Sequence, residues 1–412
     1  MTIEWNPTRL GEVVKIKHGF AFSGMAENAD PSLPVVVGIG NFDYAGGFRF
    51  GSTTVKRFIG NYPPEFALTP GDVLLAMTCQ TAGGEILGIP GTVPDDGQTY
   101  LHNQRLGKVE VLDPTRIDLR YFFQLARWQP FNHYLFATAS GSKILHTAPG
   151  RIEDFVVNLP SLPEQRSIAA TLSALDEKIE SNRRASKLIS ELVLARFRAV
   201  VLENDFSLVP LGKLTNAVKG RSYKSAELAD STTALVTLKS IDRNGGYKAD
   251  GLKPYTGDYK PSQVVAPGEI VVAQTDLTQG AEVVGRGVRV PASAEYETLV
   301  ASLDLTIVRP ADGMPVEYLL GLLTSDDFRE WCRSRVTGTT VLHLAKDVIP
   351  SWPAPLVSPE KQRAFADDVG VLYQRLDSLA AEASRLIALR DALLPELLSG
   401  RIRAVDPEGQ PA

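Results

Sequence analysis

The sequence has little cysteine, no long apolar run and no excess of basic residues, and each shortage excludes a class of protein. Its 412 residues contain only Cys79 and Cys332, too few for a disulfide framework or a cysteine-rich zinc site. The longest apolar runs, such as residues 35–37 and 270–273, are far shorter than the roughly 20 residues that cross a bilayer. The first residues are not a basic stretch followed by an apolar one, which is the pattern of a secretory signal. We therefore expect a reduced, cytoplasmic protein without a membrane partner.

Residue patterns typical of catalysis are also missing. The sequence contains no Gly-x-x-x-x-Gly-Lys-Ser/Thr phosphate loop, and its five histidines lack the spacing of metal ligands. Residues 61–64 resemble the Asn-Pro-Pro-aromatic loop of amino-methyltransferases only faintly and in the wrong order, so we interpret them as a turn. Residues 94–96 could begin the motif of a metal-dependent nuclease. The Glu-x-Lys that completes this motif is missing after Glu110, so we interpret residues 94–96 as a hairpin turn. The sequence therefore predicts a protein without catalytic residues, metal or cofactor.

No large region of the sequence has the excess of basic residues that a broad nucleic-acid-binding surface would need. The net charge is −5, and residues 1–160 carry 13 basic and 15 acidic groups, against 16 and 18 in residues 204–357. Any face for a polyanion must therefore be a local patch. One candidate patch lies between Tyr44 and Pro64, where every charge is basic.

The chain repeats itself. Matching segments are residues 10–13 and 211–214, 42–48 and 241–247, 70–76 and 267–273, 140–146 and 337–343, and 163–166 and 359–363. The matches occur in the same order over nearly 200 residues, with an offset that drifts by only a few residues. A colinear repeat of this length predicts two structurally equivalent halves.

In each half the residue pattern changes once, from short apolar runs to a long helical periodicity. This change predicts an α+β protein with pseudo-twofold internal symmetry. Short apolar runs bounded by Gly, Pro and Asp turns indicate β-rich domains, with short helices near residues 119–127 and 316–323. Long helical segments follow each domain. The expected parts are residues 1–160 and 204–357 as β-rich domains, 161–203 and 358–400 as long helices, and 401–412 as a flexible tail.

Both helical segments carry a narrow heptad seam. The seam residues are Ile168, Leu172, Leu175, Ile179, Asn182, Ser186, Ile189 and Val193 in the first helix, and Phe365, Val369, Leu372, Leu376, Leu379, Ala383, Leu386, Arg390 and Leu393 in the second. A capping box at Ser161 and Glu164 starts the first helix, and Pro395 should end or kink the second. Such seams need partner helices, so we expect an antiparallel coiled coil. Asn182 either sets its register or is a solvated position.

The junctions between domains and helices resemble those of a known family. Residues 159–169, which run into residues 175–179, are similar to the central helical region of the specificity subunits of type I restriction–modification enzymes. Residues 355–363 are a looser version of the same junction, and residues 397–402 resemble the family's C-terminal helix. The resemblance covers essentially the whole chain.

This resemblance implies a non-catalytic DNA-recognition subunit that takes part in defence against phage. Each β-rich domain is then a target-recognition domain that reads one half of a bipartite, asymmetric sequence in double-stranded DNA. The helices set the spacing between the halves and dock two copies of an adenine methyltransferase subunit, with ATP-dependent restriction subunits as further partners. Lys361 and Gly370 disturb the second helix relative to the first, which leaves the symmetry of docking open.

Candidate DNA-binding residues lie in loops that match in position between the halves but differ in identity, as two different half-sites require. The loop pairs are residues 15–20 and 217–224, 77–81 and 274–279, and 140–143 and 337–340. The full set of candidates, with the basic patch included, is Lys15, Lys17, His18, Phe20, Arg49, Lys56, Arg57, Gln80, Thr81, Ser142, Lys143, Lys219, Arg221, Tyr223, Lys224, Arg243, Gln274, Thr275, Thr339 and Thr340. For each of them a solvated surface position is the alternative.

Two other functions remain open at this stage. A stand-alone methyltransferase or nuclease with unrecognised motifs would transfer methyl groups from S-adenosylmethionine, or cut DNA with Mg²⁺, as an isolated chain. A structural dimerisation protein would show no salt-dependent binding to DNA.

Overall fold

The computed structural model describes residues 5–23, 26–27, 30–51, 54–243, 245–278 and 280–404. Gln279, at the end of one predicted loop, and residues 405–412 of the predicted tail lie outside the described residues. Contacts divide the chain into a first unit, Met1–Glu177 with Ile387–Ala412, and a second unit, Lys178–Leu386. Each unit contains one β-rich domain and part of each long helix.

The first unit is built around a sheet with the strand order β2-β11-β7-β9. These strands are β2 (Val14–His18), β11 (Leu106–Val111), β7 (Val73–Ala76) and β9 (Pro90–Thr92). A second sheet has the order β3 (Ala26–Glu27), β5 (Lys56–Arg57), β4 (Val35–Val37), β10 (Tyr100–His102) and β6 (Ala67–Leu68). Two strand pairs are β1 (Asn6–Arg9) with β13 (Val156–Leu159) and β8 (Thr78–Cys79) with β12 (Leu145–His146). Short helices are α1 (Leu119–Ala126), α2 (Gln129–Ala137) and α3 (Pro149–Glu153).

The second unit repeats this architecture. Its main sheet has the order β15 (Thr215–Lys219), β22 (Leu305–Pro310), β18 (Ile270–Ala273) and β20 (Gly287–Arg289). A second sheet has the order β17 (Lys253–Pro254), β16 (Thr233–Val236) and β21 (Thr298–Ala301). A third has the order β19 (Thr275–Asp276), β24 (Leu342–Leu344) and β23 (Val336–Thr337), and β14 (Ser207–Pro210) pairs with β25 (Pro353–Leu356). Its short helices are α5 (Val316–Thr324), α6 (Asp326–Arg333) and α7 (Val348–Ser351).

The strand pairings confirm the internal repeat. The main sheets have equivalent orders, and each half contains one parallel pair, β4 with β10 and β16 with β21. Backbone conformation is matched too, since Gly88 and Gly285 have φ angles of 78° and 76°. The two halves therefore share a fold as well as a sequence pattern.

The apolar runs of the sequence form fully buried strands because helices cover the main sheets. All four residues of β7 and of β18 are buried. In the first unit, Tyr121 and Phe122 of α1 pack in one core with Leu74 of β7. The expected helices at residues 119–127 and 316–323 are thus confirmed as α1 and α5.

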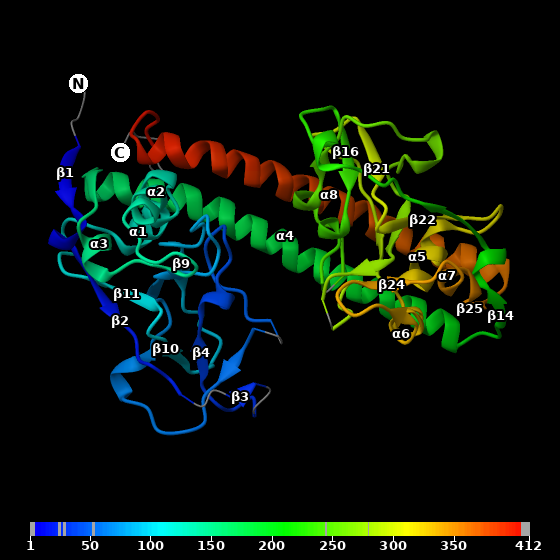
Figure 1. The fold of residues 1–412 in the computed structure, drawn as a ribbon, viewed down its shortest axis with the longest axis horizontal. Coiled ribbons are helices and arrows are strands. Elements are labelled where there is room, and N and C mark those ends of the chain that lie inside the picture. Colours follow the sequence, from blue (N-terminus) through cyan, green and yellow to red (C-terminus); the bar gives the residue numbers. More distant parts are fainter. Residues whose placement is uncertain are drawn as a thin grey trace. The chain divides into compact units, whose positions relative to one another are not determined.

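The long helices are α4 (Leu162–Leu202) and α8 (Pro359–Leu398), drawn in green and in orange to red in Figure 1. They run antiparallel in both units: Arg390 contacts Asp176 in the first, and Asn182 contacts Glu382 in the second, where Arg196 contacts Asp368. Every seam residue is buried or half-buried. These contacts confirm the predicted pairing. At Asn182, the amide is 2% exposed and donates to Glu382 over 2.9 Å, so this position is not solvated.

Pro395 lies inside α8, three residues before the helix ends at Leu398. Two local predictions need correction. The turn at residues 94–96 is not a hairpin, because β9 and β10 belong to different sheets. The capping box is half formed: the Ser161 hydroxyl accepts from the Glu164 N–H at 3.4 Å, but the Glu164 carboxylate bonds to Trp5 and Arg403.

Helices α2 and α6 had no sequence prediction at all, although each follows α1 or α5 almost directly. Among the described residues, no helix is both long and apolar enough to cross a membrane. The part of the predicted tail that is described bonds back to the first unit through Arg403, and Ala404 is buried.

Candidate nucleic-acid interface

In the first unit, three chain segments leave the main sheet at one edge. The strand register aligns His18 of β2 with Gly107 of β11, and Gly107 with Leu75 of β7. Because β11 runs antiparallel to both neighbours, β2 and β7 end where β11 begins. The loop after β2, the turn before β11 and the segment after β7 therefore meet at this edge, called here the first loop edge.

The segment after β7 continues into β8, which brings a fourth loop to the first loop edge. Strand β8 pairs antiparallel with β12, with Cys79 opposite Leu145. The loop that follows β8 and the loop that precedes β12 thus emerge from the same end of this pair. Two loops that were predicted separately, residues 77–81 and 140–143, are brought together by the fold.

The second unit has the same edge, called here the second loop edge. Lys219 of β15 aligns with Thr306 of β22, and Thr306 with Val272 of β18. Strand β19 pairs with β24, with Asp276 opposite Leu342. The loops that follow β15 and β19 and the loop that precedes β24 therefore meet in the equivalent arrangement.

The turn that opens β11 was missed by the sequence analysis although it lies in the middle of the first loop edge. The backbone N–H of Leu106 donates to Asn103 over 3.0 Å, and the turn is held on one side by the N–H of Gln104, which donates to Phe20 over 2.9 Å. On the other side the N–H of Met77 donates to the carbonyl oxygen of Arg105 over 3.0 Å. We call residues 103–106 the first turn.

The equivalent second turn consists of residues 302–305. Leu305 donates to Ser302 over 2.9 Å, and Gln274 donates to Asp304 over 2.8 Å. Glycine is required beside both turns, because a Cβ on Gly220 would lie 2.0 Å from the Ser302 carbonyl oxygen and one on Gly19 would lie 2.2 Å from that of Asn103. The signal that could have revealed the turns was the repeat itself, which aligns Asn103 with Ser302.

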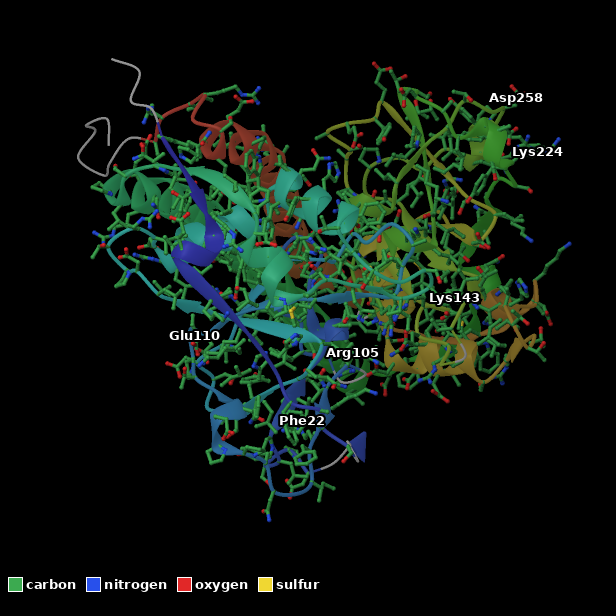
Figure 2. All side chains as sticks on the ribbon, turned by 60° about the vertical axis from the view of Figure 1, so that its left-hand side comes forward. Phe22, Arg105, Glu110, Lys143, Lys224 and Asp258 are labelled. Atoms are coloured by element: carbon green, nitrogen blue, oxygen red, sulfur yellow. The ribbon has the colours of Figure 1, made fainter. Side chains whose placement is uncertain are left out.

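Several predicted residues of the first half lie at the first loop edge and are exposed. They are Lys17 and His18 at the end of β2, Gln80 and Thr81 after β8, and Ser142 and Lys143 before β12. Arg105 and Lys143 are labelled in Figure 2. Phe20 is half-buried and packs on Phe22 and Phe66, with ring centroids 5.1 and 5.2 Å apart.

The other first-half candidates lie away from the loop edge or are held by the protein. Lys15 pairs with Glu153 at 3.3 Å, and Arg49 pairs with Asp43 at 2.5 Å. Arg57 donates to Leu33 and to Gln98, on the sheet that also contains Lys56. Lys56 and Arg57 thus lie on the second sheet of the first unit.

In the second half, the residues after β15 lie beside an aromatic pair. Arg221 donates to the Tyr255 hydroxyl over 3.4 Å, and Lys253 lies 5.6 Å from the ring centre of Tyr223. Lys219 and Lys224 are exposed, and Lys224 is labelled in Figure 2. Lys253 and the half-buried Tyr223 thus place a basic and an aromatic group side by side, a combination suited to a nucleic acid, while Tyr255 is buried.

The remaining second-half candidates differ in accessibility. Thr339 and Thr340 are exposed in the loop before β24, and Gln274 is half-buried. Arg243 is 66% exposed and pairs with Glu282 at 3.3 Å. Thr275 is buried at 7% exposure, and its hydroxyl donates to Asp304 over 2.9 Å. Thr275 thus supports the second turn from beneath.

Each loop after β8 or β19 is anchored by a buried side chain. Asp276 is 2% exposed and accepts from Val283, Val284 and Thr278. Burial acts to raise the pKa of Asp276, but these hydrogen bonds outweigh it and leave the pKa below its ordinary value. In the first half the equivalent residue is Cys79, whose Sγ lies 3.0 Å from the Thr81 hydroxyl.

A neutral histidine lies under the first turn. His102 is 3% exposed, and its Nε2 donates to the Leu106 carbonyl oxygen over 2.9 Å. Burial lowers the pKa of His102 to about 4. At neutral pH this ring is therefore an uncharged part of the scaffold beneath the first turn.

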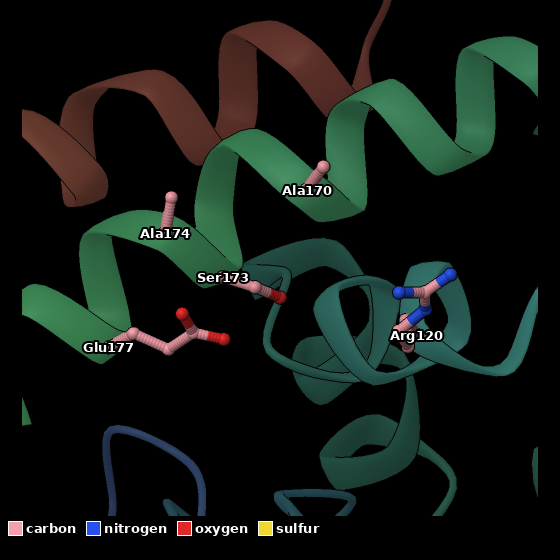
Figure 3. A pocket seen from close by; sticks show the side chains of 5 residues that line it. All are labelled: Arg120, Ala170, Ser173, Ala174 and Glu177. Atoms are coloured by element: carbon pink, nitrogen blue, oxygen red, sulfur yellow. The ribbon is translucent and has the colours of Figure 1, made fainter. Parts of the chain in front are cut away.

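Two hollows in the described surface of the first unit are lined by residues outside the first loop edge. One lies along α4 beside Arg120 of α1, and Figure 3 shows it lined by Ala170, Ser173, Ala174 and Glu177. Within the described ranges, no group of three His, Cys, Asp or Glu side chains could hold a metal ion. The candidate interface is therefore an edge of loops.

Comparisons with known proteins agree with this architecture. Residues 2–191 match the type I restriction modification DNA specificity domain. The chain is 27% identical over 420 residues to the type I restriction enzyme MjaVIII specificity subunit of Methanocaldococcus jannaschii, covering 97% of this chain and 93% of that protein. It is 25% identical over 229 residues to the type I restriction enzyme EcoBI specificity subunit of Escherichia coli, covering 54% of this chain and 42% of that protein.

A solved structure extends the likeness to the whole fold. The crystal structure of the S subunit of a type I restriction–modification system from M. genitalium superposes with a TM-score of 0.58 at 16% identity, and 96% of each chain is covered. Together with the repeated domains and the paired helices α4 and α8, these findings show that the chain is similar in sequence to type I restriction–modification specificity subunits and has the fold of one of them.

Proposed function

We propose that this chain recognises a bipartite sequence in double-stranded DNA for a type I restriction–modification complex, and that each loop edge reads one half-site. One observation carries the proposal: the same set of loops converges at the same sheet edge in both halves, matched in position and different in identity. Two different half-sites need this arrangement, because base edges are read by side-chain identity on a common scaffold.

The first test is a binding measurement on the chain in complex with an adenine methyltransferase subunit. We expect affinity for target DNA to fall steeply with salt, because the basic loop residues displace counterions from phosphates. Mapping methylated adenines in cells that express the complex should reveal one bipartite sequence. Methylation without sequence preference would contradict the proposal.

The helices α4 and α8 are proposed to set the gap between the half-sites. One heptad inserted after Ile179 and one after Leu379 would preserve the seam, because seven residues restore its phase. The insertion adds about 10 Å at 1.5 Å per residue, so the gap should widen by about one to three base pairs. An unchanged gap in a variant that still methylates DNA would exclude this role.

Two copies of the methyltransferase subunit are proposed to dock on the long helices, with ATP-dependent restriction subunits joining the same complex. Support comes from apolar side chains that the helices leave exposed, with Leu188 at 65% and Leu192 at 43% on adjacent turns of α4. Leu188→Asp with Leu192→Asp should abolish co-purification with the methyltransferase and preserve the helical circular-dichroism signal. Unchanged co-purification would exclude this face.

A further inference from the structure

The first and second turns are rigid platforms in the middle of the loop edges. Each turn is closed by its own hydrogen bond and tied by the main chain to the segment that leads into β8 or β19. A close-packed glycine, Gly19 or Gly220, holds the loop after β2 or β15 against each turn. Side chains on such a platform lose little conformational freedom when they bind, which favours selective recognition.

The two turns carry opposite chemistry at their central positions. The first turn presents Gln104 and Arg105, both exposed. The second presents Leu303, which is 40% exposed, and the half-buried Asp304. Within the described part of the chain, Arg105 makes no side-chain hydrogen bond or ion pair, whereas one Asp304 oxygen accepts from Thr275. Arg105 is thus an unpaired guanidinium on a fixed support.

These residue types match different base edges in the major groove. Arginine makes two parallel hydrogen bonds to O6 and N7 of guanine, and glutamine makes a similar pair to adenine. An exposed apolar side chain contacts the methyl group of thymine, and a carboxylate accepts from the amino group of cytosine. The first turn is therefore suited to purines and the second to pyrimidines.

We propose that Arg105 reads a guanine in the first half-site, and that Leu303 and Asp304 read a thymine–cytosine step in the second. This inference rests on the proposed function, because it assigns bases to the two loop edges. It makes the turns specificity-determining elements and leaves the surrounding lysines to hold phosphates.

The test uses the complex of the full chain with its methyltransferase subunit. After the wild-type target is mapped, Arg105→Ala and Arg105→Lys are compared on DNA in which each base of the first half-site is varied. Arg105→Ala should reduce the preference for guanine at one position by about 10- to 100-fold. Arg105→Lys should restore only part of it, since lysine cannot form the planar fork. The second half-site should be unchanged in both variants.

A matched control is Arg116→Ala. Arg116 is a partly exposed arginine on the turn after the far end of β11, where it pairs with Glu12 at 3.1 Å. The Arg116→Ala variant should leave the base preferences at both half-sites unchanged. Leu303→Gln should alter the second half-site alone, by weakening the preference for thymine at one position.

The outcomes separate this inference from the proposed function. If the wild type methylates a bipartite sequence and Arg105→Ala keeps its full preference, the assignment of Arg105 is wrong and the proposed function stands. A uniform loss on all sequences, with a salt slope reduced by about one, would place Arg105 on a phosphate and also overturn the assignment. If the wild type shows no bipartite target, the proposed function itself fails.

Discussion

The two β-rich halves differ far less in their cores than at their loop edges. Phe131 of α2 and Phe328 of α6 are equivalent and fully buried, and the residues of β7 and β18 are exchanged only among aliphatic types. At the loop edges, by contrast, the position held by Arg105 in the first half is held by Asp304 in the second. Close packing therefore constrains the residues of the scaffold, while the exposed residues of the loop edges are free to change their chemistry.

The loops that follow β8 and β19 show the same contrast in their support. In the first half, the amide of Asn132 donates to the Leu87 carbonyl oxygen over 3.1 Å. In the second, Arg286 and Arg329 both donate to the carbonyl oxygen of Glu282, over 2.7 and 3.3 Å. One loop conformation is thus held by neutral donors in one half and by charged donors in the other.

The largest expected effect comes from the anchor of the second loop. Asp276→Ala leaves the N–H groups of Val283 and Val284 without their buried acceptor, so we expect a loss of about 3 kcal/mol in the free energy of unfolding. Cys79→Ala, at the equivalent position, should cost about 1 kcal/mol because it removes a small buried side chain and only weak sulfur hydrogen bonds to Thr81. Urea unfolding of both variants measures the difference. Equal losses would show that the carboxylate is not the anchor.

His102 should make the first half more sensitive to acid than the second. Its pKa is lowered to about 4 in the folded protein, against about 6.5 in an unfolded chain. Between these values the unfolded state binds the extra proton, so stability falls as pH falls, by up to about 3 kcal/mol. In the second half the equivalent position is Ala301, and the lowered pKa of Asp276 acts only below about pH 4.

Urea unfolding of wild type and His102→Ala from pH 7 to pH 4 checks this expectation. The variant should be less stable at pH 7, because it leaves a cavity, but its stability should fall less steeply as the pH is lowered. Hydrogen exchange should locate the acid-induced opening in the first unit. A parallel fall in the two proteins would contradict it.

A smaller effect is expected where one repeat uses glycine and the other alanine. Gly84 has a φ angle of 66°, and the equivalent Ala281 has a φ of 48°, which is costly for a residue with a Cβ. Gly84→Ala should lose about 1–2 kcal/mol, since its Cβ would also meet Phe136 at 2.3 Å. Ala281→Gly should gain about 0.5 kcal/mol. Thermal unfolding of the two single variants checks both signs, and a stabilising Gly84→Ala would refute the argument.

The sequence predicted the elements that depend on periodic burial. The seam of α4 and α8 follows from heptads, and the equivalence of the halves follows from segments such as residues 70–76 and 267–273. Helices α2 and α6 were missed because each follows a preceding helix almost without a break. Helix α8 ends at Leu398, three residues after Pro395, where the sequence placed its end.

The candidate interface was predicted only in part. Residues 80–81 and 142–143 were recognised as loops, but their meeting depends on the pairing of β8 with β12, which no local pattern encodes. The first turn was missed because Gln104 and Arg105 have no unusual composition. Only the register of β2, β11 and β7 places this turn at the centre of the first loop edge.

The most direct test of the account is to give the chain two copies of one reading domain. Residues 204–357 are replaced by a copy of residues 1–160, with α4 and α8 kept, and methylated adenines are mapped in cells that express the variant with the proposed adenine methyltransferase partner. If each loop edge reads its own half-site, every methylated target should contain the first half-site twice, and the second half-site should disappear. Persistence of the second half-site in the methylated targets would contradict the account.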